Sequence, residues 1–295
     1  MGPGMAATLA RGGLAVQTYD ISTDAIERAK SEISSAFEVL DRMPSPAAKV
    51  RGEISFYTDL AQAVSHTDLV IEAVPENAEL KAAVFAEIEQ RSPASAILAS
   101  NTSGIPITKI QEAVRTPERV VGMHWSNPPH VIPMIEIIAG SHTSTVTVEN
   151  LKTLVSDLGL LPVIVKKDVP GFVENRVLYA IMRECLALVD DGVIDPADLD
   201  TCIRWGIGYK LSVIGPLELL DVAGLDIYEA VGSYLNADLN NRTTVSETIT
   251  SRTQKGELGM KTGKGIYNYT PESISRLRRQ RAAKLVSVRH ALEAP

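Results

Sequence analysis

The sequence predicts an α/β protein in which a doubly wound parallel sheet is followed by an all-helical domain. Three observations support this prediction. Short β-type runs alternate with helical runs from residue 13 to about residue 140, and the run at 68–74 is almost continuously apolar. After residue 170 no further strand pattern is found. Alternating strands and helices are typical of parallel sheets whose strands are buried on both faces. We therefore expect two domains, 1–168 and 169–295.

The elements of the first domain follow from hydrophobic periodicity. We expect strands at 13–20, 68–74, 96–100, 119–124, 134–138 and 161–167, and helices near 22–42, 78–90 and 106–114. A further helix places Leu151, Leu154, Val155 and Leu158 at positions i, i+3, i+4 and i+7. Gly159 follows this helix directly and suits its end, because glycine adopts the left-handed conformation that often terminates helices.

Start and stop signals divide the second domain into helices. A long helix is predicted to begin at Pro170 and to reach about Val189. The remaining boundaries are capping signals: Asp195-Pro196 opens a helix that Gly206 closes, Gly215-Pro216 opens one that ends near Gly224, Asp226 caps the next, and Thr270-Pro271 opens the last.

Composition excludes several classes of protein. The 295 residues suffice for two domains, and 45% hydrophobic with 22% charged residues is an ordinary globular composition. The formal charge of −7 argues against a general nucleic-acid-binding protein. Basic residues between Arg276 and Arg289 are expected to form the solvated face of a terminal helix. No apolar run reaches 18 residues, so no membrane span is expected.

Two features predict a cytoplasmic protein. Cys185 and Cys202 lie in apolar, helical surroundings without a metal or redox spacing, so we expect buried free thiols and a reducing compartment. The first sixteen residues lack the basic and long apolar regions of a signal peptide.

The start of the chain resembles part of a dinucleotide-binding loop. Gly2 and Gly4 precede a short Ala-rich helix, and Asp20 ends the strand that follows. In Rossmann-type sheets, glycines allow a pyrophosphate to approach the backbone, and such an acid binds the ribose hydroxyls of NAD in preference to NADP. The complete loop and its central strand would lie before Met1. We therefore expect this chain to bind NAD more weakly than one extended upstream by about ten residues, the length of a strand plus its loop.

Seven segments in order give the chain a resemblance to the L-3-hydroxyacyl-CoA dehydrogenase family. They are MGPGMA at the start, IEAVPEN (71–77), SNTSGIPI (100–107), GMHWSNPPHVIPMIEII (122–138), VPGFVENR (169–176), GPLELLDVAGLD (215–226) and KTGKGIY (261–267). The resemblance spans nearly the whole chain. It implies a Rossmann domain, a helical domain through which two copies dimerise, and NAD as the cofactor.

The same resemblance implies roles for individual residues. His124 is similar to the catalytic base and Glu136 to its carboxylate partner, while Ser103 and Asn175 resemble the residues that hold the reacting oxygen. The remaining positions resemble cofactor contacts: Gly2, Gly4, Asp20, Glu76, Lys81, Asn101, Ser103 and Lys261. No metal is implied. Each of three residues also has a structural interpretation: Ser103 as a helix cap, Asn175 as a partner of helix backbone, and Lys261 as an exposed loop lysine.

Chemistry explains why these residue types are needed. Oxidation of an alcohol removes a hydride and a proton, and a histidine titrates near neutrality and accepts the proton. A lone histidine at a strand end is more often structural, but Glu136 between apolar neighbours would be costly to bury without a partner. His124 ends one strand and Glu136 lies on the next, so a connection through Asn127-Pro128-Pro129 would bring them side by side.

The sequence departs from the acyl-CoA enzymes where they bind CoA. The aligned positions hold Ala36 and Met43, with Glu38 and Asp41 nearby, and the connection through Ser45-Pro46 is short. Carboxylates repel phosphate groups. Three segments resemble a bacterial branch that acts on small carboxylates without CoA, such as 5-formyl-3-hydroxy-2-methylpyridine-4-carboxylate, an intermediate of vitamin B6 degradation: HWSNPPHVIPMIE (124–136), VPGFVENRVLYA (169–180) and GVIDPADLDTCIRWGIGYK (192–210). Carnitine dehydrogenase and lambda-crystallin resemble the chain more distantly. Such a substrate needs a cation, for which Arg176, Lys210 and His130 are candidates.

Two classes of function stay open at this point. The first is an NAD-dependent oxidoreductase for an L-3-hydroxyacyl substrate or, alternatively, for a small hydroxy or formyl carboxylate that reacts as its hydrate. The second is a non-catalytic role, either as a crystallin-like protein or as a truncated, inactive product.

Overall fold

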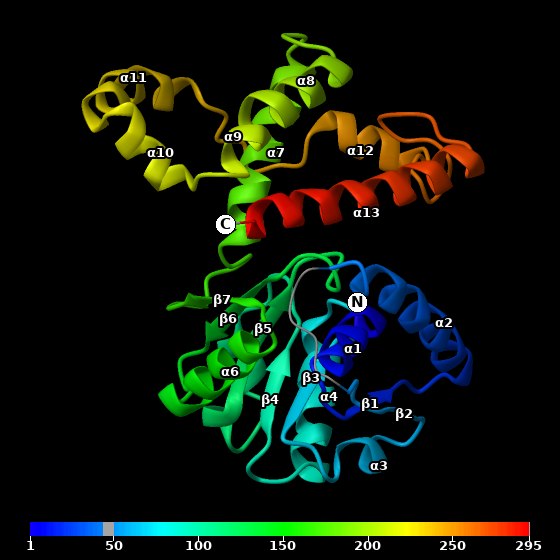
Figure 1. Ribbon diagram of the computed structural model, residues 1–295. Coiled ribbons are helices and arrows are strands. Elements are labelled where there is room, and N and C mark those ends of the chain that lie inside the picture. The colour runs from blue at the N-terminus through cyan, green and yellow to red at the C-terminus, as the bar shows by residue number, and fades with distance from the viewer. Residues whose placement is uncertain (44–49, 295) are drawn as a thin grey trace. The chain divides into compact units, whose positions relative to one another are not determined.

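The computed structural model describes residues 1–43 and 50–294 as two compact units, Met1–Arg176 and Val177–Pro295, and each is described by itself (Figure 1). The predicted connection through Ser45-Pro46 lies outside the described residues. The division between the units falls inside helix α7 (Glu174–Asp190), shortly after the predicted domain boundary.

The first unit alternates strands and helices, as predicted. Its strands are β1 (Val16–Tyr19), β2 (Ile54–Tyr57), β3 (Leu69–Glu72), β4 (Ile97–Ser100), β5 (Val120–Trp125), β6 (Met134–Ala139) and β7 (Leu161–Val165). Its helices are α1 (Gly2–Arg11), α2 (Thr23–Leu40), α3 (Leu60–Val64), α4 (Ala78–Arg91), α5 (Ile107–Gln111) and α6 (Thr145–Asp157), with a short 3-10 turn at Pro117–Arg119. The sequence predictions gave no bounds for β2 or α3.

The strands form two hydrogen-bonded pieces. One is the parallel pair β1–β2, and the other has the order β3-β4-β5-β6-β7. Strands β1 and β3 therefore each lie at the end of their own piece. All pairs are parallel except β5–β6, which is antiparallel. The reversal follows from the connection 126–133, which is too short for the crossover that parallel neighbours need.

Side-chain caps explain where the longer helices begin. Ser22, Asn77 and Ser144 each accept a hydrogen bond from a backbone N–H in the first turn of α2, α4 and α6. These bonds satisfy amides that have no partner inside the helix. Gly159 has a φ of 68° and follows the cap residue of α6, so the predicted stop is confirmed.

Two apolar clusters cover the two faces of the larger sheet, and this arrangement orients the site. Met123 and Trp125 of β5 lie in one cluster, against α6. Because successive strand residues point to opposite faces, His124 between them faces the other cluster. There its ring centroid lies 6.0 Å from that of Phe172, which is fully buried.

The second unit is helical, which confirms the predicted class. After α7 come α8 (Pro196–Cys202), a π-helical segment (Ile203–Gly208), α9 (Tyr209–Leu211), α10 (Pro216–Ala223), α11 (Leu225–Asp238), α12 (Glu247–Gln254) and α13 (Pro271–Glu293). Thr270 caps α13 in a reciprocal capping box, as its position before Pro271 predicted. In the described part of the chain, no helix has the length and apolar character needed to cross a bilayer.

Three boundary predictions are wrong. The long helix begins at Glu174 and not at Pro170, because Gly171 and Phe172 have φ angles of 78° and 48°, which an α-helix excludes. Gly206 does not end a helix, because the chain continues through it in π-helical geometry. Asp226 lies in the first turn of α11, and the cap position is Gly224.

The two cysteines are free, and their burial differs from the prediction. Cys185 is half-buried and Cys202 is exposed. Burial and nearby acids raise the pKa of the Cys185 thiol, which favours the unreactive protonated form.

Candidate active site

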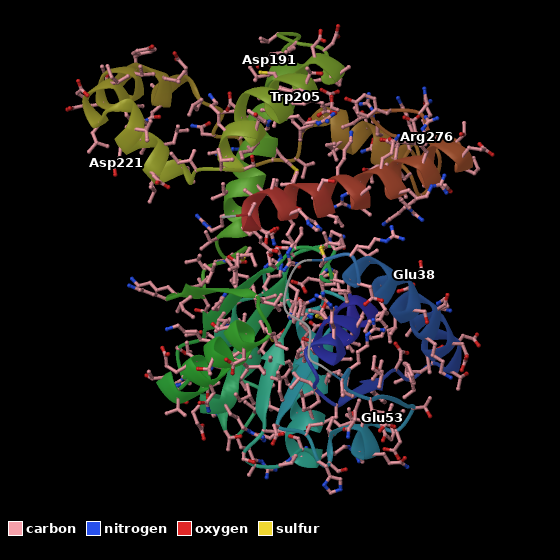
Figure 2. The ribbon with its side chains drawn as sticks, in the orientation of Figure 1. Glu38, Glu53, Asp191, Trp205, Asp221 and Arg276 are labelled. Atoms are coloured by element: carbon pink, nitrogen blue, oxygen red, sulfur yellow. The ribbon has the colours of Figure 1, made fainter. Side chains whose placement is uncertain are left out.

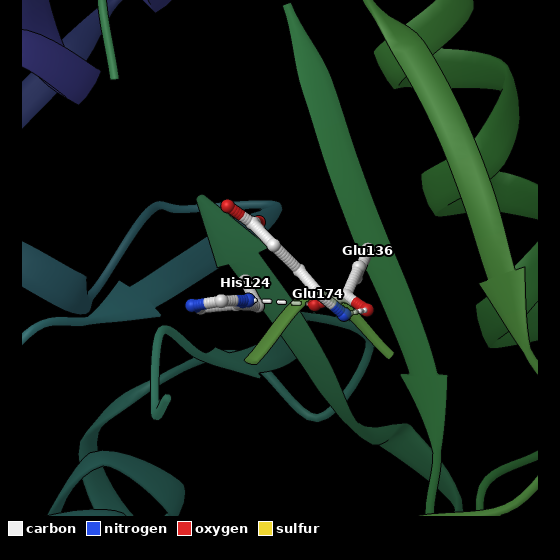
Figure 3. A group of neighbouring side chains, drawn as sticks. All are labelled: His124, Glu136 and Glu174. Carbon is white, nitrogen blue, oxygen red and sulfur yellow. Dashed lines mark hydrogen bonds and ion pairs between the residues drawn. The ribbon is translucent and has the colours of Figure 1, made fainter. Parts of the chain in front are cut away.

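The predicted acid–base pair is assembled by the antiparallel strands β5 and β6. His124 and Glu136 are register partners, and the His124 Nδ1 lies 2.7 Å from the Glu136 Oε2 (Figure 3). Their exposed fractions are 5% and 1%. Among the described residues, the Nε2 of His124 has no protein hydrogen-bond partner. When the carboxylate is ionised it accepts a hydrogen bond from the Nδ1–H group, so the neutral ring presents an unprotonated Nε2.

The second carboxylate oxygen of Glu136 is held by the chain before α7. Glu136 Oε1 accepts hydrogen bonds from the backbone amides of Val173 at 2.9 Å and Glu174 at 3.0 Å. Burial alone raises the pKa of Glu136, but the hydrogen bonds from His124 and from these two amides outweigh it and bring the pKa below its ordinary value. Glu136 is therefore ionised at neutral pH.

A strained turn supplies the two amides. Phe172 has a left-handed φ of 48°, which costs a residue with a Cβ about 1–3 kcal/mol. Its side chain is completely buried, and the turn directs the next two N–H groups at Glu136. The packing of Phe172 and the hydrogen bonds to Glu136 offset the strain.

Glu76 organises the loop that carries Ser103. Its Oε1 accepts hydrogen bonds from the Thr102 Oγ1 at 2.6 Å and from the amides of Ser103 and Gly104 at 3.0 and 3.1 Å. Partial burial raises the pKa of Glu76, but these bonds and the charge of Lys81 lower it overall. The predicted cofactor residue Glu76 is thus a fixed carboxylate at the base of this loop.

Ser103 and Asn175, the predicted oxygen-binding residues, lie together. The Asn175 Nδ2 donates to the backbone carbonyl of Ser103 at 2.8 Å. Ser103 does not cap a helix, because α5 begins at Ile107 with Pro106 as its cap residue. Ser103 is exposed and Asn175 is half-buried, so both are accessible within this unit. Their role toward a substrate stays a prediction.

Lys81, a predicted cofactor contact, is enclosed within the first unit. It is 1% exposed, and its Nζ lies 2.8 Å from Glu72 Oε1 and 3.2 Å from the Val74 carbonyl. Ser100 donates to the second oxygen of Glu72 at 2.7 Å. Sequence reasoning missed Glu72 as the counterion, although a single acid ending an apolar strand was the available signal.

The other predicted cofactor residues of this unit follow the carboxyl ends of its strands. Asp20 follows β1, and its Oδ1 accepts from the Ser22 amide at 2.9 Å. Asn101 follows β4, and its Oδ1 accepts from the Trp125 amide at 2.9 Å, which ties β4 to β5 beside His124. In open α/β sheets ligands bind at this edge, and a half-exposed acid after β1 suits ribose hydroxyls. The donor set therefore fits NAD.

The remaining predicted cofactor contacts lie in helix α1 and in the second unit. Gly2 and Gly4 lie in the first turn of α1 and not in a loop. A Cβ at Gly4 would stand 2.8 Å from the Pro129 Cγ, so a side chain there would have to displace the segment that joins β5 to β6. Lys261 belongs to the second unit, in an exposed turn between the bridged residues Gly259 and Lys264. Its cofactor contact stays a prediction.

Sequence reasoning also missed Ser126 and Glu174. Ser126, at the end of β5, is 3% exposed, and its hydroxyl donates to a carboxylate oxygen of Glu174. One ligating atom from each of His124, Glu136 and Glu174 lies within 4.8 Å of the other two. Such a group also has the spacing of a cation site, and the prediction that no metal binds stays a prediction. The sequence offered no signal for Ser126, because it lies far from Glu174 in the chain.

An imidazole backed by an ionised carboxylate, set at the carboxyl edge of a doubly wound sheet with an acid after β1, defines an NAD-dependent dehydrogenase. The NAD-binding domain of 3-hydroxyacyl-CoA dehydrogenase matches residues 1–169, and the C-terminal domain of the same enzymes matches residues 171–269. The chain belongs to the 3-hydroxyacyl-CoA dehydrogenase family and is an NAD-dependent enzyme of that family.

Individual relatives are named for different substrates. The chain is 57% identical over 99% of its length to 5-formyl-3-hydroxy-2-methylpyridine 4-carboxylate 5-dehydrogenase of Mesorhizobium japonicum, of which it covers 95%. It is 35% identical over 91% of its length to a probable 3-hydroxybutyryl-CoA dehydrogenase of Bacillus subtilis, of which it covers 94%.

Solved structures include relatives of both of these kinds. A crystal structure of a 5-formyl-3-hydroxy-2-methylpyridine 4-carboxylic acid 5-dehydrogenase, described as an NAD+-dependent dismutase, matches with a TM-score of 0.97 at 56% identity, over 100% of this chain and 96% of that one. The (S)-3-hydroxybutyryl-CoA dehydrogenase of Ralstonia eutropha matches with a TM-score of 0.73 at 32% identity, over 92% and 95%.

Proposed function

We propose that this dehydrogenase oxidises the aldehyde group of a small aromatic carboxylate, with 5-formyl-3-hydroxy-2-methylpyridine-4-carboxylate as the first candidate. The observation that carries the proposal is the 57% identity over 99% of the chain to a relative named for that substrate. The sequence predictions placed an L-3-hydroxyacyl compound first and a small carboxylate second. The relatives favour the second.

The positions aligned with CoA contacts support the same choice. Ala36 and Met43 are 3% and 6% exposed, and Ala36 packs against Ala7 of α1. Neither position offers a hydrogen-bond donor to a nucleotide. Glu38, on the same helix, is exposed and carries a negative charge (Figure 2). The phosphate groups of an acyl-CoA would therefore be repelled by Glu38 near the positions that the predicted alignment assigns to CoA contacts.

A substrate carboxylate needs a cation. Of the three predicted candidates, His130 and Arg176 differ in burial and therefore in charge. Burial lowers the pKa of His130, which keeps that ring neutral. Arg176 is exposed and follows Asn175 directly. Lys210 belongs to the second unit. Arg176 is therefore the candidate in the first unit that carries a positive charge, and we assign it to the substrate carboxylate.

In the proposed reaction the aldehyde first adds water, because only the hydrate has an O–H whose proton can leave. NAD, when bound, supplies the acceptor for the hydride. The Nε2 of His124 removes the hydroxyl proton, and the ionised Glu136 stabilises the resulting imidazolium. Ser103 and Asn175, joined by their hydrogen bond, hold the reacting oxygen. The products are a carboxylic acid, NADH and a proton.

The description of one solved relative as a dismutase adds a second half-reaction to the proposal. In a dismutation two aldehydes and one water give one acid and one alcohol. His124, protonated in the oxidation, donates its proton to the oxygen of the second aldehyde as that aldehyde is reduced. The same pair then serves as base in one half-reaction and as acid in the other.

The test is a parallel assay of the purified chain with NAD and three substrates: the formylpyridine carboxylate, 3-hydroxybutyryl-CoA and L-carnitine. We expect NADH formation with the formylpyridine carboxylate, and acid and alcohol products when no NADH is removed. Turnover of the CoA thioester alone would replace the proposal with the acyl-CoA reaction. Retention of full turnover by a His124→Gln variant would reject the acid–base assignment.

A further inference from the structure

The proposed mechanism makes no use of the side chain of Glu174. This residue begins α7, and its backbone amide already holds Glu136 Oε1. Its side chain extends away from the Glu136 carboxylate and past the His124 ring (Figure 3). One ligating atom from each of His124, Glu136 and Glu174 lies within 4.8 Å of the other two. A single small molecule can therefore contact both the Glu174 carboxylate and the imidazole.

Two contacts give this carboxylate a defined position. The buried Ser126 hydroxyl donates to one of its oxygens, and the residue's backbone is tied to Glu136. Among the described residues, no lysine or arginine forms an ion pair with Glu174, although it is only half-exposed. A partly buried carboxylate without a cation needs further hydrogen-bond donors. A donor from the substrate would satisfy it.

The two half-reactions differ in the number of hydroxyl groups at the reacting carbon. The hydrate that is oxidised carries two, and His124 can accept the proton of only one. The second O–H needs an acceptor, which a carboxylate provides and the Asn175 amide nitrogen does not. The aldehyde that is reduced carries one oxygen and no second hydroxyl. An acceptor beside His124 is therefore useful in oxidation and idle in reduction.

We propose that Glu174 is a specificity-determining residue that binds the second hydroxyl of the aldehyde hydrate, oriented by Ser126. The inference rests on the proposed function. Hydride leaves the carbon for NAD, the first hydroxyl proton goes to the Nε2 of His124, and the C–O bond of that hydroxyl becomes the carbonyl. The second hydroxyl stays bonded to carbon as the O–H of the acid, and its hydrogen bond to Glu174 favours the hydrate over the free aldehyde in the site.

The test compares oxidation and reduction of one aldehyde by a Glu174→Gln variant. Glutamine keeps the size of the side chain and an oxygen for Ser126, but removes the charge. Because a hydrogen bond to a charged group is worth more than a neutral one, we expect kcat/KM for NADH formation to fall about 10- to 100-fold. We expect kcat/KM for NADH-dependent reduction of the same aldehyde to stay within about threefold, because it does not use the acceptor.

Two further variants control the comparison. Ser126→Ala leaves the carboxylate in place but removes its orienting donor, so a smaller loss confined to oxidation is expected. Glu149→Gln makes the same chemical change on the exposed face of α6 and should alter neither direction. The reduction rate also reports whether each variant is folded.

Each outcome supports or overturns either the proposed function or the proposed role of Glu174. An equal fall in both directions would overturn the role in hydrate binding, and so would an unchanged oxidation rate. Selective loss of oxidation would support it. If the unmodified protein neither oxidises nor reduces the aldehyde, the proposed function fails and this inference fails with it. Wild-type turnover therefore tests the function, and the ratio of the two rates in the variant tests Glu174.

Discussion

Replacing Glu136 with glutamine should reverse the tautomer of His124, the proposed catalytic base. In the wild-type protein Glu136 accepts on both oxygens, from His124 Nδ1 on one side and from the amides of Val173 and Glu174 on the other. The backbone amides can only donate, so the glutamine oxygen must face them. Its NH2 group then faces Nδ1 and donates to it. The histidine proton moves to Nε2, where it blocks the lone pair that accepts the substrate proton.

The size of the effect follows from this geometry. A carboxylate-to-amide change behind a catalytic histidine of a serine protease lowers kcat about 10⁴-fold by the same tautomer change, so we expect a loss of about 10³- to 10⁴-fold here. Stability should change less. Hydrogen bonds to a charged acceptor become bonds to a neutral one, and the free energy of unfolding should fall by about 1–3 kcal/mol.

The assay is steady-state NADH formation by wild type and Glu136→Gln, with denaturant unfolding of both proteins as the folding control. The pH dependence of unfolding supplies a second readout. The folded-state pKa of Glu136 lies below the ordinary value of 4.5, so its charge stabilises the fold above about 4.5, and this contribution is lost as the pH falls through the folded-state pKa. The difference in unfolding free energy between the two proteins should therefore shrink in acid. A folded variant that keeps wild-type kcat would refute the tautomer argument.

Three other substitutions and one treatment test the surrounding site. Glu76→Gln removes the charge that holds three donors of the Ser103 loop, so KM for the substrate should rise about tenfold while the melting temperature falls by a few degrees; an unchanged KM would count against an ordering role. Asp20→Asn should weaken NAD binding about 5- to 50-fold and narrow the preference over NADP, measured by titrating the cofactor against protein fluorescence. Equal affinity would remove Asp20 from the cofactor contacts. Gly4→Ala places a Cβ 2.8 Å from the Pro129 Cγ and should destabilise the protein by about 1–3 kcal/mol in a denaturant titration. Dialysis of the protein against a chelator should leave turnover unchanged, because the reaction assigned to His124 needs no cation. If turnover instead falls and a divalent metal restores it, the group formed by His124, Glu136 and Glu174 binds a functional cation.

The parts of the fold that the sequence predicted are those determined locally. Gly159 ends α6 and Thr270 caps α13 because turn conformation and capping depend on a few neighbouring residues. The strand that ends near His124 was also predicted, from the β-type run 119–124. The pairing of His124 with Glu136 was also predictable, since the short connection between their strands allows only an antiparallel arrangement.

The parts that were missed depend on contacts between distant segments. Nothing local distinguishes Lys81 from a surface lysine of an amphipathic helix, yet the acid at the end of β3 draws it into the interior. The same limit applies to Ser126 and Glu174, which meet only because α7 begins beside β5. The start of α7 was misplaced for a different reason. A left-handed phenylalanine is rare, and no propensity predicts it.

This left-handed turn connects the three tasks of the site. By interrupting the helix at Phe172, it aims two amides at Glu136 and thereby fixes the catalytic pair. The first helical turn that follows carries Glu174, which accepts a hydrogen bond from Ser126, and Asn175, which donates one to the Ser103 carbonyl; these are the two side chains that we propose to contact the reacting oxygens. In the proposed mechanism, acid–base chemistry thus depends on the backbone of this segment, and substrate choice depends on its side chains. A change at Glu174 can therefore alter which carbonyl compound is oxidised while the hydrogen bonds that keep Glu136 ionised stay in place.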